Sequence, residues 1–173
     1  MKYPTAGTTK ALLLFVPNHT RPRNREEETA HLRAYLLKAN NCPPEIVDTC
    51  AKQMATLIRG EKCILIPVPD RNGNTERNYF LADHIAHFAD DAEVQDSLTR
   101  SQPTASQCDR HRKGKQALTP EELKITVKPH KLFKLLPVYF VDNVITTGAT
   151  IQACHNALGF GTGLVYAEAL RRK

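Results

Sequence analysis

The chain has 173 residues, 41% of them hydrophobic and 24% charged, which predicts one globular domain, at most with an extension, and enough apolar material for a core. A membrane-spanning helix needs ~20 consecutive apolar residues, and no run in the sequence approaches that length. The formal net charge of +6 suits nucleic acid or a small polyanion and does not discriminate between them.

The cysteines and the N-terminal segment exclude further classes. No Cys-x-x-Cys pair occurs, so the sequence supports neither a zinc ribbon nor a thioredoxin-type redox site, and we expect reduced, mostly buried thiols. The apolar run at residues 11–16 is too short for a secretory signal, and we expect a cytoplasmic protein. The five cysteines of the chain are Cys42, Cys50, Cys63, Cys108 and Cys154.

The N-terminal third predicts one strand and two helices. Residues 11–16, "ALLLFV", read as a short buried strand that Pro17 ends. The acidic residues 26–28 suit the first turn of a helix, and Pro43-Pro44 suits the start of a second one. Gly60 is expected to cap the second helix. The expected apolar faces are Leu32, Tyr35, Leu36 and Ala39 for the first helix, and Val47, Cys50, Ala51, Met54, Leu57 and Ile58 for the second.

The rest of the chain alternates apolar runs with amphipathic segments. "CILIPVP" (63–69) and "PVYFVDN" (137–143) predict strands buried on both faces. A third helix is expected to turn Leu81, Ala82, Ile85, Ala86 and Ala89 inward, and a fourth to follow at residues 150–158. We further expect a strand at 93–100, a long loop to about residue 122, short strands or a hairpin at 125–136, and a last strand at 163–170.

Buried strands alternating with helices predict an α/β fold with a parallel sheet. Ligands of such sheets bind beyond the carboxyl ends of the strands. Two strand ends carry polar residues there, "IPVPDR" (66–71) and "FVDNVITTGAT" (140–150). These two segments are therefore the candidate functional site.

The turn at residues 146–150, "TTGAT", lies between a predicted strand and a predicted helix. The first N–H groups of a helix lack internal partners and favour an anion, and Gly148 removes the Cβ that would obstruct a phosphate. The hydroxyl groups of Thr146, Thr147 and Thr150 add donors. A purely structural strand-to-helix turn is the alternative, since the GxxxxGK[ST] pattern of a P-loop is absent.

Asp142 and Asn143 precede that turn directly. Their side chains could accept hydrogen bonds from two neighbouring sugar hydroxyls, so that the segment as a whole suits a ribose 5-phosphate. In the alternative reading, Asp142 only caps the turn. The histidines add little, because His84 and His87 lie three residues apart on the third helix and would need a further metal ligand.

The segment "VYFVDNVITTGAT" (138–150) resembles the phosphoribosyl pyrophosphate (PRPP) motif of type I phosphoribosyltransferases. All thirteen positions agree in type and order except Asn143, where the family usually has a second acid. "IPVPDRNGNTERNYFLADHIA" and "LTRSQPTASQCDRHRKGK" resemble segments of the ComF-like subfamily, and the three together cover about residues 62–172. The zinc-binding cysteine pairs often found before ComF-like domains are absent from this sequence.

The resemblance implies a type I phosphoribosyltransferase fold: a core at residues 61–173, with residues 1–60 as a strand and two helices that form an extension or hood of the same unit. It implies Asp142 and Asn143 as the catalytic pair on the ribose. Thr146, Thr147, Gly148, Ala149 and Thr150 would hold the 5-phosphate, and Pro69, Asp70, Arg71 and Arg77 would lie on the pyrophosphate side. Arg100, Arg110, Arg112 and Lys113 would lie on or beside a flexible loop that closes over the pyrophosphate.

The activity implied is transfer of the phosphoribosyl group from PRPP to a nitrogenous, nucleobase-like acceptor, with Mg²⁺ bound mainly through PRPP and no protein metal site. Thr146 stands where some purine-salvage members have an acid, which weakens a hypoxanthine/guanine assignment. The alternatives are a non-catalytic PRPP sensor or ComF-like DNA-uptake-associated binding protein and, less favoured, simple nucleic-acid binding. No membrane partner is expected, and a homodimer is left open.

Overall fold

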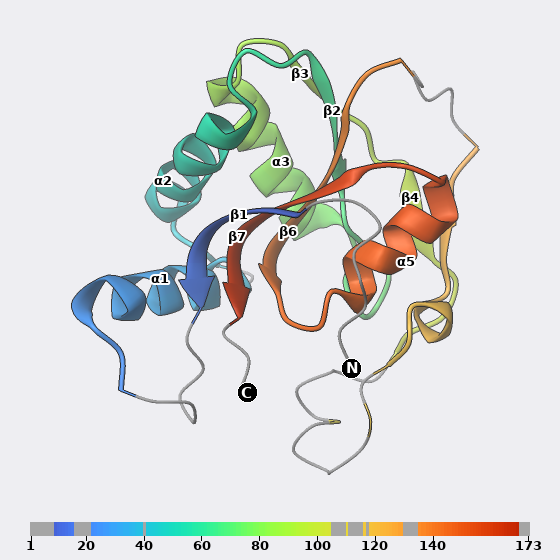
Figure 1. Ribbon diagram of the computed structural model, residues 1–173, viewed down its shortest axis with the longest axis horizontal. Coiled ribbons are helices and arrows are strands. Elements are labelled where there is room, and N and C mark those ends of the chain that lie inside the picture. The colour runs from blue at the N-terminus through green and yellow to red at the C-terminus, as the bar shows by residue number, and fades with distance from the viewer. Residues whose placement is uncertain are drawn as a thin grey trace.

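The computed structural model (Figure 1) describes residues 9–15, 22–39, 41–104, 110, 116, 118–129 and 135–169. Its strands are β1 (Thr9–Phe15), β2 (Cys63–Pro67), β3 (Ala92–Val94), β4 (Leu98–Arg100), β5 (Ile125–Val127), β6 (Val138–Ile145) and β7 (Thr162–Ala169). Its helices are α1 (Arg25–Leu36), α2 (Pro44–Ala55), α3 (Glu76–Phe88) and α5 (Ala149–Leu158), with short 3₁₀ turns at Thr56–Ile58 and Glu121–Leu123.

The main sheet confirms the predicted parallel α/β architecture. Its order is β1-β7-β6-β2-β3, and every adjacent pair is parallel. The two apolar runs singled out in the sequence are direct neighbours, with Ile64 opposite Val138 and Pro67 opposite Val141. Both strands therefore end at the same edge of the sheet, which brings their polar ends together.

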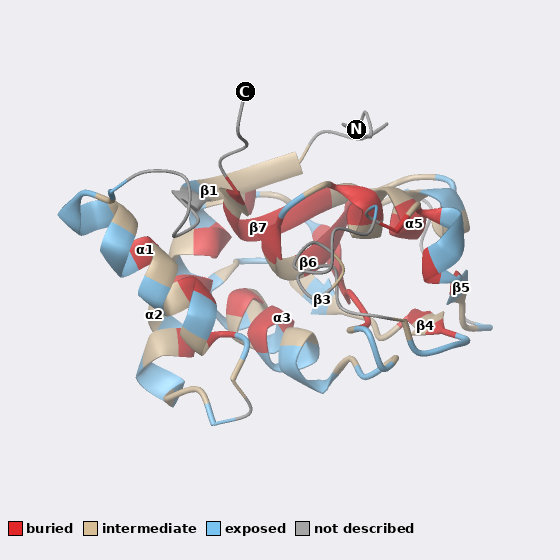
Figure 2. Cartoon of the chain, turned by 90° about the horizontal axis from the view of Figure 1, so that it is seen from below, coloured by how far each residue is buried: buried red, intermediate tan, exposed pale blue. Residues whose placement is uncertain are grey.

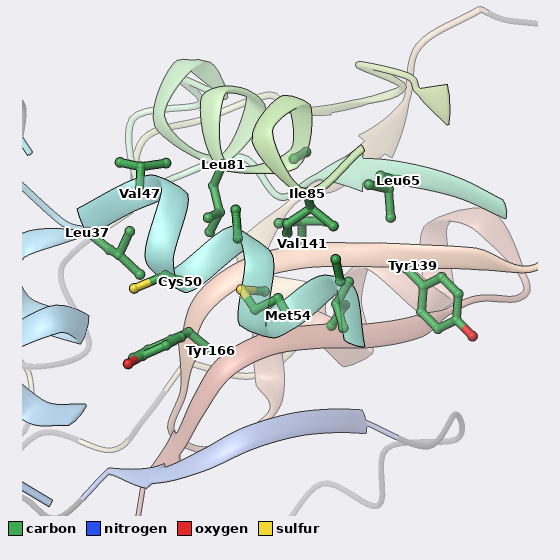
Figure 3. Close-up of a cluster of buried hydrophobic side chains, with 14 of the residues drawn as sticks. Leu37, Val47, Cys50, Met54, Leu65, Leu81, Ile85, Tyr139, Val141 and Tyr166 are labelled. Atoms are coloured by element: carbon green, nitrogen blue, oxygen red, sulfur yellow. The ribbon is translucent and has the colours of Figure 1, made fainter. Parts of the chain in front are cut away.

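Helices cover both faces of this sheet. Apolar residues of α2 and α3, with Ala34 and Leu37 from the end of α1, form one core against β2, β6 and β7 (Figure 3). Residues of α5 and of the β4–β5 pair form the second core on the opposite face. In Figure 2 the buried positions run along the central strands, while the helices carry exposed positions on their outward sides. No helix in the described ranges is long and apolar enough to cross a membrane.

Local signals place most helix ends where the sequence predicted them. Glu26, Glu27 and Glu28 occupy the first turn of α1, which Asn24 and Glu27 close with a capping box. Pro44 is the first residue of α2, where a missing N–H costs nothing. Gly60 does not cap α2, whose C-cap is Thr56; it follows the 3₁₀ turn Thr56–Ile58 and has φ +74°, a left-handed conformation that favours glycine.

The predicted apolar face of α1 is wrong. Leu32 and Tyr35 are 55% and 68% exposed, whereas Ala30 and Ala34 are buried. The helix covers the edge of the sheet at β1 and β7, and its small residues face inward there. Periodicity identified the helix correctly but could not show which side would meet the sheet.

Three strand predictions hold only in part. The predicted strand at 93–100 is split, because β3 pairs with β2 and the chain then leaves the main sheet to pair β4 with β5. The prediction of short strands or a hairpin at 125–136 is confirmed for one short strand: β5 pairs antiparallel with β4, and residues 130–134 lie outside the described residues. Among the described strands β1 pairs with β7 alone, so Ala11 and Leu12 are half-buried and Leu13 is exposed.

Candidate functional site

A cavity of about 290 Å³ opens where β2 and β6 end. Pro69, Asp70 and Arg71 line it from the segment after β2. Asp142, Asn143 and Thr150 line it from β6 and the start of α5. The two segments that the sequence predicted at separate strand ends thus share one pocket, because their strands are adjacent and parallel.

The loop after β2 is organised by Asp70. Its Oδ1 accepts hydrogen bonds from the backbone N–H groups of Asn72 (2.8 Å) and Asn74 (2.9 Å). Gly73 has φ +88°, and a Cβ there would lie 3.1 Å from the carbonyl oxygen of Arg100. The turn therefore requires both the carboxylate and a glycine, and Asp70 shapes the backbone of the pocket wall.

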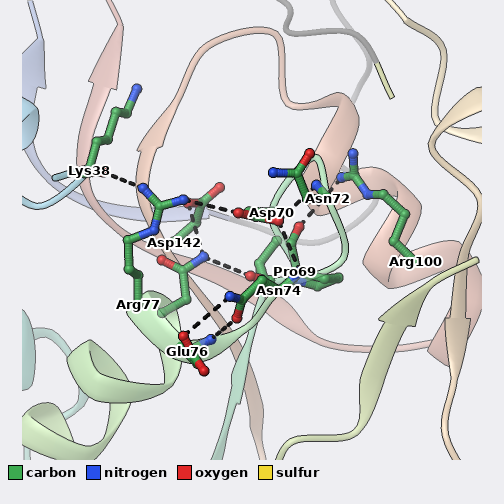
Figure 4. Close-up of polar contacts among 11 residues, drawn as sticks. Lys38, Pro69, Asp70, Asn72, Asn74, Glu76, Arg77, Arg100 and Asp142 are labelled. Atoms are coloured by element: carbon green, nitrogen blue, oxygen red, sulfur yellow. Dashed lines mark hydrogen bonds and ion pairs between the residues drawn. The ribbon is translucent and has the colours of Figure 1, made fainter. Parts of the chain in front are cut away.

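Arg77, on the first turn of α3, connects this loop to the end of α1 (Figure 4). Its Nη2 lies 3.0 Å from Asp70 Oδ2, and its Nη1 donates to the carbonyl oxygen of Lys38. The Lys38 side chain is exposed, and the residue also lines the pocket. The N-terminal region is in this way joined to the candidate site by one guanidinium group.

Asp142 and Asn143 lie inside β6, which continues to Ile145, and not at its end. The Asp142 Oδ1 accepts a hydrogen bond from the N–H of Asn143 (2.8 Å), and the Asn143 Oδ1 accepts one from the N–H of Val144 (2.7 Å). Burial raises the pKa of the Asp142 carboxyl. The Asn143 N–H and the positive charges of Lys38 and Arg100 act in the opposite direction and offset part of this rise. A donor or cation supplied by a ligand would therefore stabilise the ionised form.

The 146–150 turn has the conformation that its glycine predicts. Gly148 lies at φ +83°, ψ −5°, as the N-cap of α5, and no side chain caps the helix there. Thr147 Oγ1 accepts a hydrogen bond from the N–H of Ala149 (3.3 Å). Ala149 is buried in the core, whereas Thr146 is exposed and Thr150 lines the pocket. Ala149 thus serves packing, and Thr150 is the threonine of this turn that reaches the cavity wall.

Arg100 is a fixed cation of the pocket wall. It ends β4, is only 9% exposed, and donates from Nη1 to Thr104 Oγ1 (2.6 Å) and from Nη2 to the carbonyl oxygen of Pro69 (3.5 Å). Its buried Nε has no hydrogen-bond partner among the described residues. Burial lowers the pKa of the guanidinium, while Asp70 and Asp142 are close enough to oppose this. A buried arginine that forms no ion pair with the described residues suits an incoming anion.

The remaining basic candidates differ from Arg100. Arg110 donates from Nε to the carbonyl oxygen of Gln116 (2.8 Å) and does not line the cavity. Arg112 and Lys113 lie outside the described residues. Arg71 is exposed and lines the cavity, and its carbonyl oxygen accepts from the N–H of Thr104 (2.9 Å).

Among the polar residues that line the pocket, sequence reasoning missed Lys38, Asn74, Asn78 and Thr104. Nothing in their local sequence marks them, because each reaches the cavity through the tertiary arrangement. No group of three candidate metal ligands occurs in the described ranges. His84 pairs with Asp48, with 2.6 Å between Nδ1 and Oδ1, and the cysteines within those ranges are free thiols.

The pocket combines cations, one raised-pKa carboxylate and a helix N-terminus, which together suit a polyanion that also carries hydroxyl groups. Comparison of the sequence with models of known protein families, and with curated proteins, finds no match.

Proposed function

We propose that the protein binds PRPP in this pocket and transfers its phosphoribosyl group to a nitrogenous acceptor with release of pyrophosphate. The observation that carries the proposal is that Pro69, Asp70 and Arg71 line one cavity together with Asp142, Asn143 and Thr150, with the buried Arg100 in its wall. We propose with it that the parallel sheet and its helices are a type I phosphoribosyltransferase fold.

The 5-phosphate would lie on the N-terminal turn of α5, because Gly148 leaves the backbone open and the helix dipole favours an anion. The ribose hydroxyls would then reach Asp142 and Asn143. The pyrophosphate would lie against the loop after β2, between Arg71 and Arg100. The ligand would thus extend from the end of β6 to the end of the neighbouring strand β2.

The reaction needs positioning and charge balance more than a nucleophilic side chain. The bond between C1 of the ribose and the pyrophosphate oxygen breaks, and its electron pair leaves with pyrophosphate. A nitrogen lone pair of the acceptor forms the new bond to C1, and the acceptor then loses a proton. Mg²⁺ carried by PRPP would neutralise charge on the leaving group, and the Asp142 Oδ2, which has no hydrogen-bond partner in the described contacts, fits contact with that ion or with a ribose hydroxyl.

A non-catalytic PRPP-binding protein is the second candidate, and Asn143 is the observation that favours it. Its Oδ1 already accepts the Val144 N–H, and an amide brings no negative charge to the developing ring cation. Ground-state binding would persist with Asp142 alone, whereas turnover would be slow. Simple nucleic-acid binding rests only on basic segments, of which much lies outside the described residues.

Isothermal titration with Mg-PRPP tests the proposal. Saturable binding is expected for the parent and a large loss for an Arg100→Met variant. The absence of binding at millimolar ligand would exclude both PRPP hypotheses. Pyrophosphate release on addition of candidate bases then separates transferase from sensor, since only the transferase releases it in step with a new glycosidic bond.

A further inference from the structure

We infer that Asn78 is a positioning residue that orients the Asp142 carboxylate toward the sugar; this inference rests on the proposed function. Asn78 lies on the first turn of α3, half-buried in the wall of the pocket. It comes from a different element than Asp142, 64 residues earlier in the chain. Its amide is the only polar side chain within the described part of α3 that contacts this carboxylate.

The Asn78 amide bridges the two strand ends that build the pocket. Its Nδ2 donates to the carbonyl oxygen of Val68 at 2.7 Å and lies 3.5 Å from Asp142 Oδ1. An NH₂ group has two hydrogens, so it can serve both acceptors at once. The short bond to Val68 anchors the amide on the loop side, and the longer contact lets it hold Asp142 at a set distance from that loop.

The two carboxylate oxygens of Asp142 therefore have different surroundings. Oδ1 faces two protein donors, the Asn143 N–H at 2.8 Å and the Asn78 amide. Oδ2 has no hydrogen-bond partner within the described contacts, and Asp142 lines the cavity. With Oδ1 held by the protein, Oδ2 is the oxygen presented to a ligand hydroxyl.

The charge of the Asp142 carboxyl group also depends on the fact that Asn78 is neutral. The charges that act on Asp142 are those of Lys38 beyond α1 and of Arg100 on β4, and the carboxylate in turn helps to raise the pKa of the Cys154 thiol on α5, which burial raises most. Asn78 adds a donor without adding charge. An aspartate at position 78 would instead put two carboxylates about 3.5 Å apart, which then share a proton over part of the pH range.

Two substitutions separate positioning from simple structural support. Asn78→Ala removes both hydrogen bonds, and Asn78→Asp keeps the size but adds charge. The probes are ribose 5-phosphate, which presents the hydroxyls, and Mg-pyrophosphate, which does not. Asn156→Ala is the matched control, because Asn156 is exposed on α5 and its side chain accepts a hydrogen bond from Gln152 at 2.8 Å, away from the pocket lining.

We expect Asn78→Ala to weaken ribose 5-phosphate binding about tenfold and to leave Mg-pyrophosphate binding within about twofold. For Asn78→Asp we expect ribose 5-phosphate affinity to fall about tenfold between about pH 6 and pH 8, beyond any change in the parent. Equal losses for both probes, or an Asn78→Asp variant with the parent's pH profile, would overturn the positioning role. A parent chain that binds neither probe would overturn the proposed function itself, and the inference with it.

Discussion

Arg100→Met separates a binding role of this arginine from a structural one. The side chain is 9% exposed and donates hydrogen bonds to Thr104 Oγ1 at 2.6 Å and to the Pro69 carbonyl at 3.5 Å, while its Nε has no partner in the part of the chain that the structure describes. Methionine is unbranched and of similar length, so it can fill the space without the charge. The variant thus removes a cation from the pocket wall and leaves its packing nearly intact.

The two effects have opposite signs. A buried ion costs several kcal/mol of desolvation, whereas a hydrogen bond from the charged guanidinium contributes roughly 1.5–3 kcal/mol, and the 3.5 Å bond less. We therefore expect the free energy of unfolding to stay level or to rise by about 1–2 kcal/mol. Binding of Mg-pyrophosphate should weaken about ten- to a hundredfold, because a charge-assisted hydrogen bond contributes roughly 1.5–3 kcal/mol.

Urea denaturation and isothermal titration measure the two quantities on the same preparation. Arg59→Met is the control for loss of one positive charge, since Arg59 is exposed and does not line the cavity. A variant that binds Mg-pyrophosphate like the parent, and loses more than about 2 kcal/mol of stability, would refute the reasoning. Arg100 would then be a structural residue.

The remaining predictions concern the glycine turn before α5, the pair Asp142 and Asn143, and the loss of stability at acid pH. Gly148→Val should weaken ribose 5-phosphate binding more than Thr147→Ala does, because the valine side chain obstructs the ligand whereas the alanine only removes one hydroxyl. Gly159→Val is the control, since Gly159 also has a positive φ, at the other end of α5. Unchanged binding by Gly148→Val would contradict the placement of the 5-phosphate at this turn. Asn143→Asp should raise turnover about ten- to a hundredfold with a competent acceptor and little gain in PRPP affinity, measured by pyrophosphate release; equal turnover at normal affinity would show the asparagine to be neutral. The pKa of Glu61 is lowered by its hydrogen bond from a lysine on β1, so the stability it contributes is present above its ordinary pKa and is lost as the pH falls below it. Glu61→Gln should reduce the loss of unfolding free energy at acid pH by about 0.5 kcal/mol, measured by urea unfolding at a series of pH values. The figure is small because the side chains of Glu61 and Lys10 are both about one-third exposed.

Much of the candidate site could be predicted because its signals are local. The order Asp142 to Thr150 encodes a strand, a glycine turn and a helix start within a few residues, and Gly148 has the left-handed conformation that this order requires. The segment at Pro69 to Arg71 follows an equally clear buried strand. The roles of these residues with PRPP stay predictions.

Other parts of the site have no local signature. Arg100 looked like one of several loop charges, and its burial follows from β4 pairing with β5 beneath the loop after β2. Asn78 reads as an ordinary polar residue in a helix's first turn, and only the adjacency of β2 and β6 brings it to Asp142. Such contacts depend on partners far apart in the chain, which no short window contains.

The sequence by itself determined the elements whose patterns depend on near neighbours: the continuous apolar runs of β2 and β6, the proline at the start of α2 and the glycine turn before α5. Only the tertiary structure decided which strands pair, which side of α1 is buried and which charges enter the cavity. The physical reason is that backbone preferences act over a few residues. Burial and charge are set by what packs against each residue, so Tyr35 lies exposed on an amphipathic helix while Arg100 is buried beside the pocket.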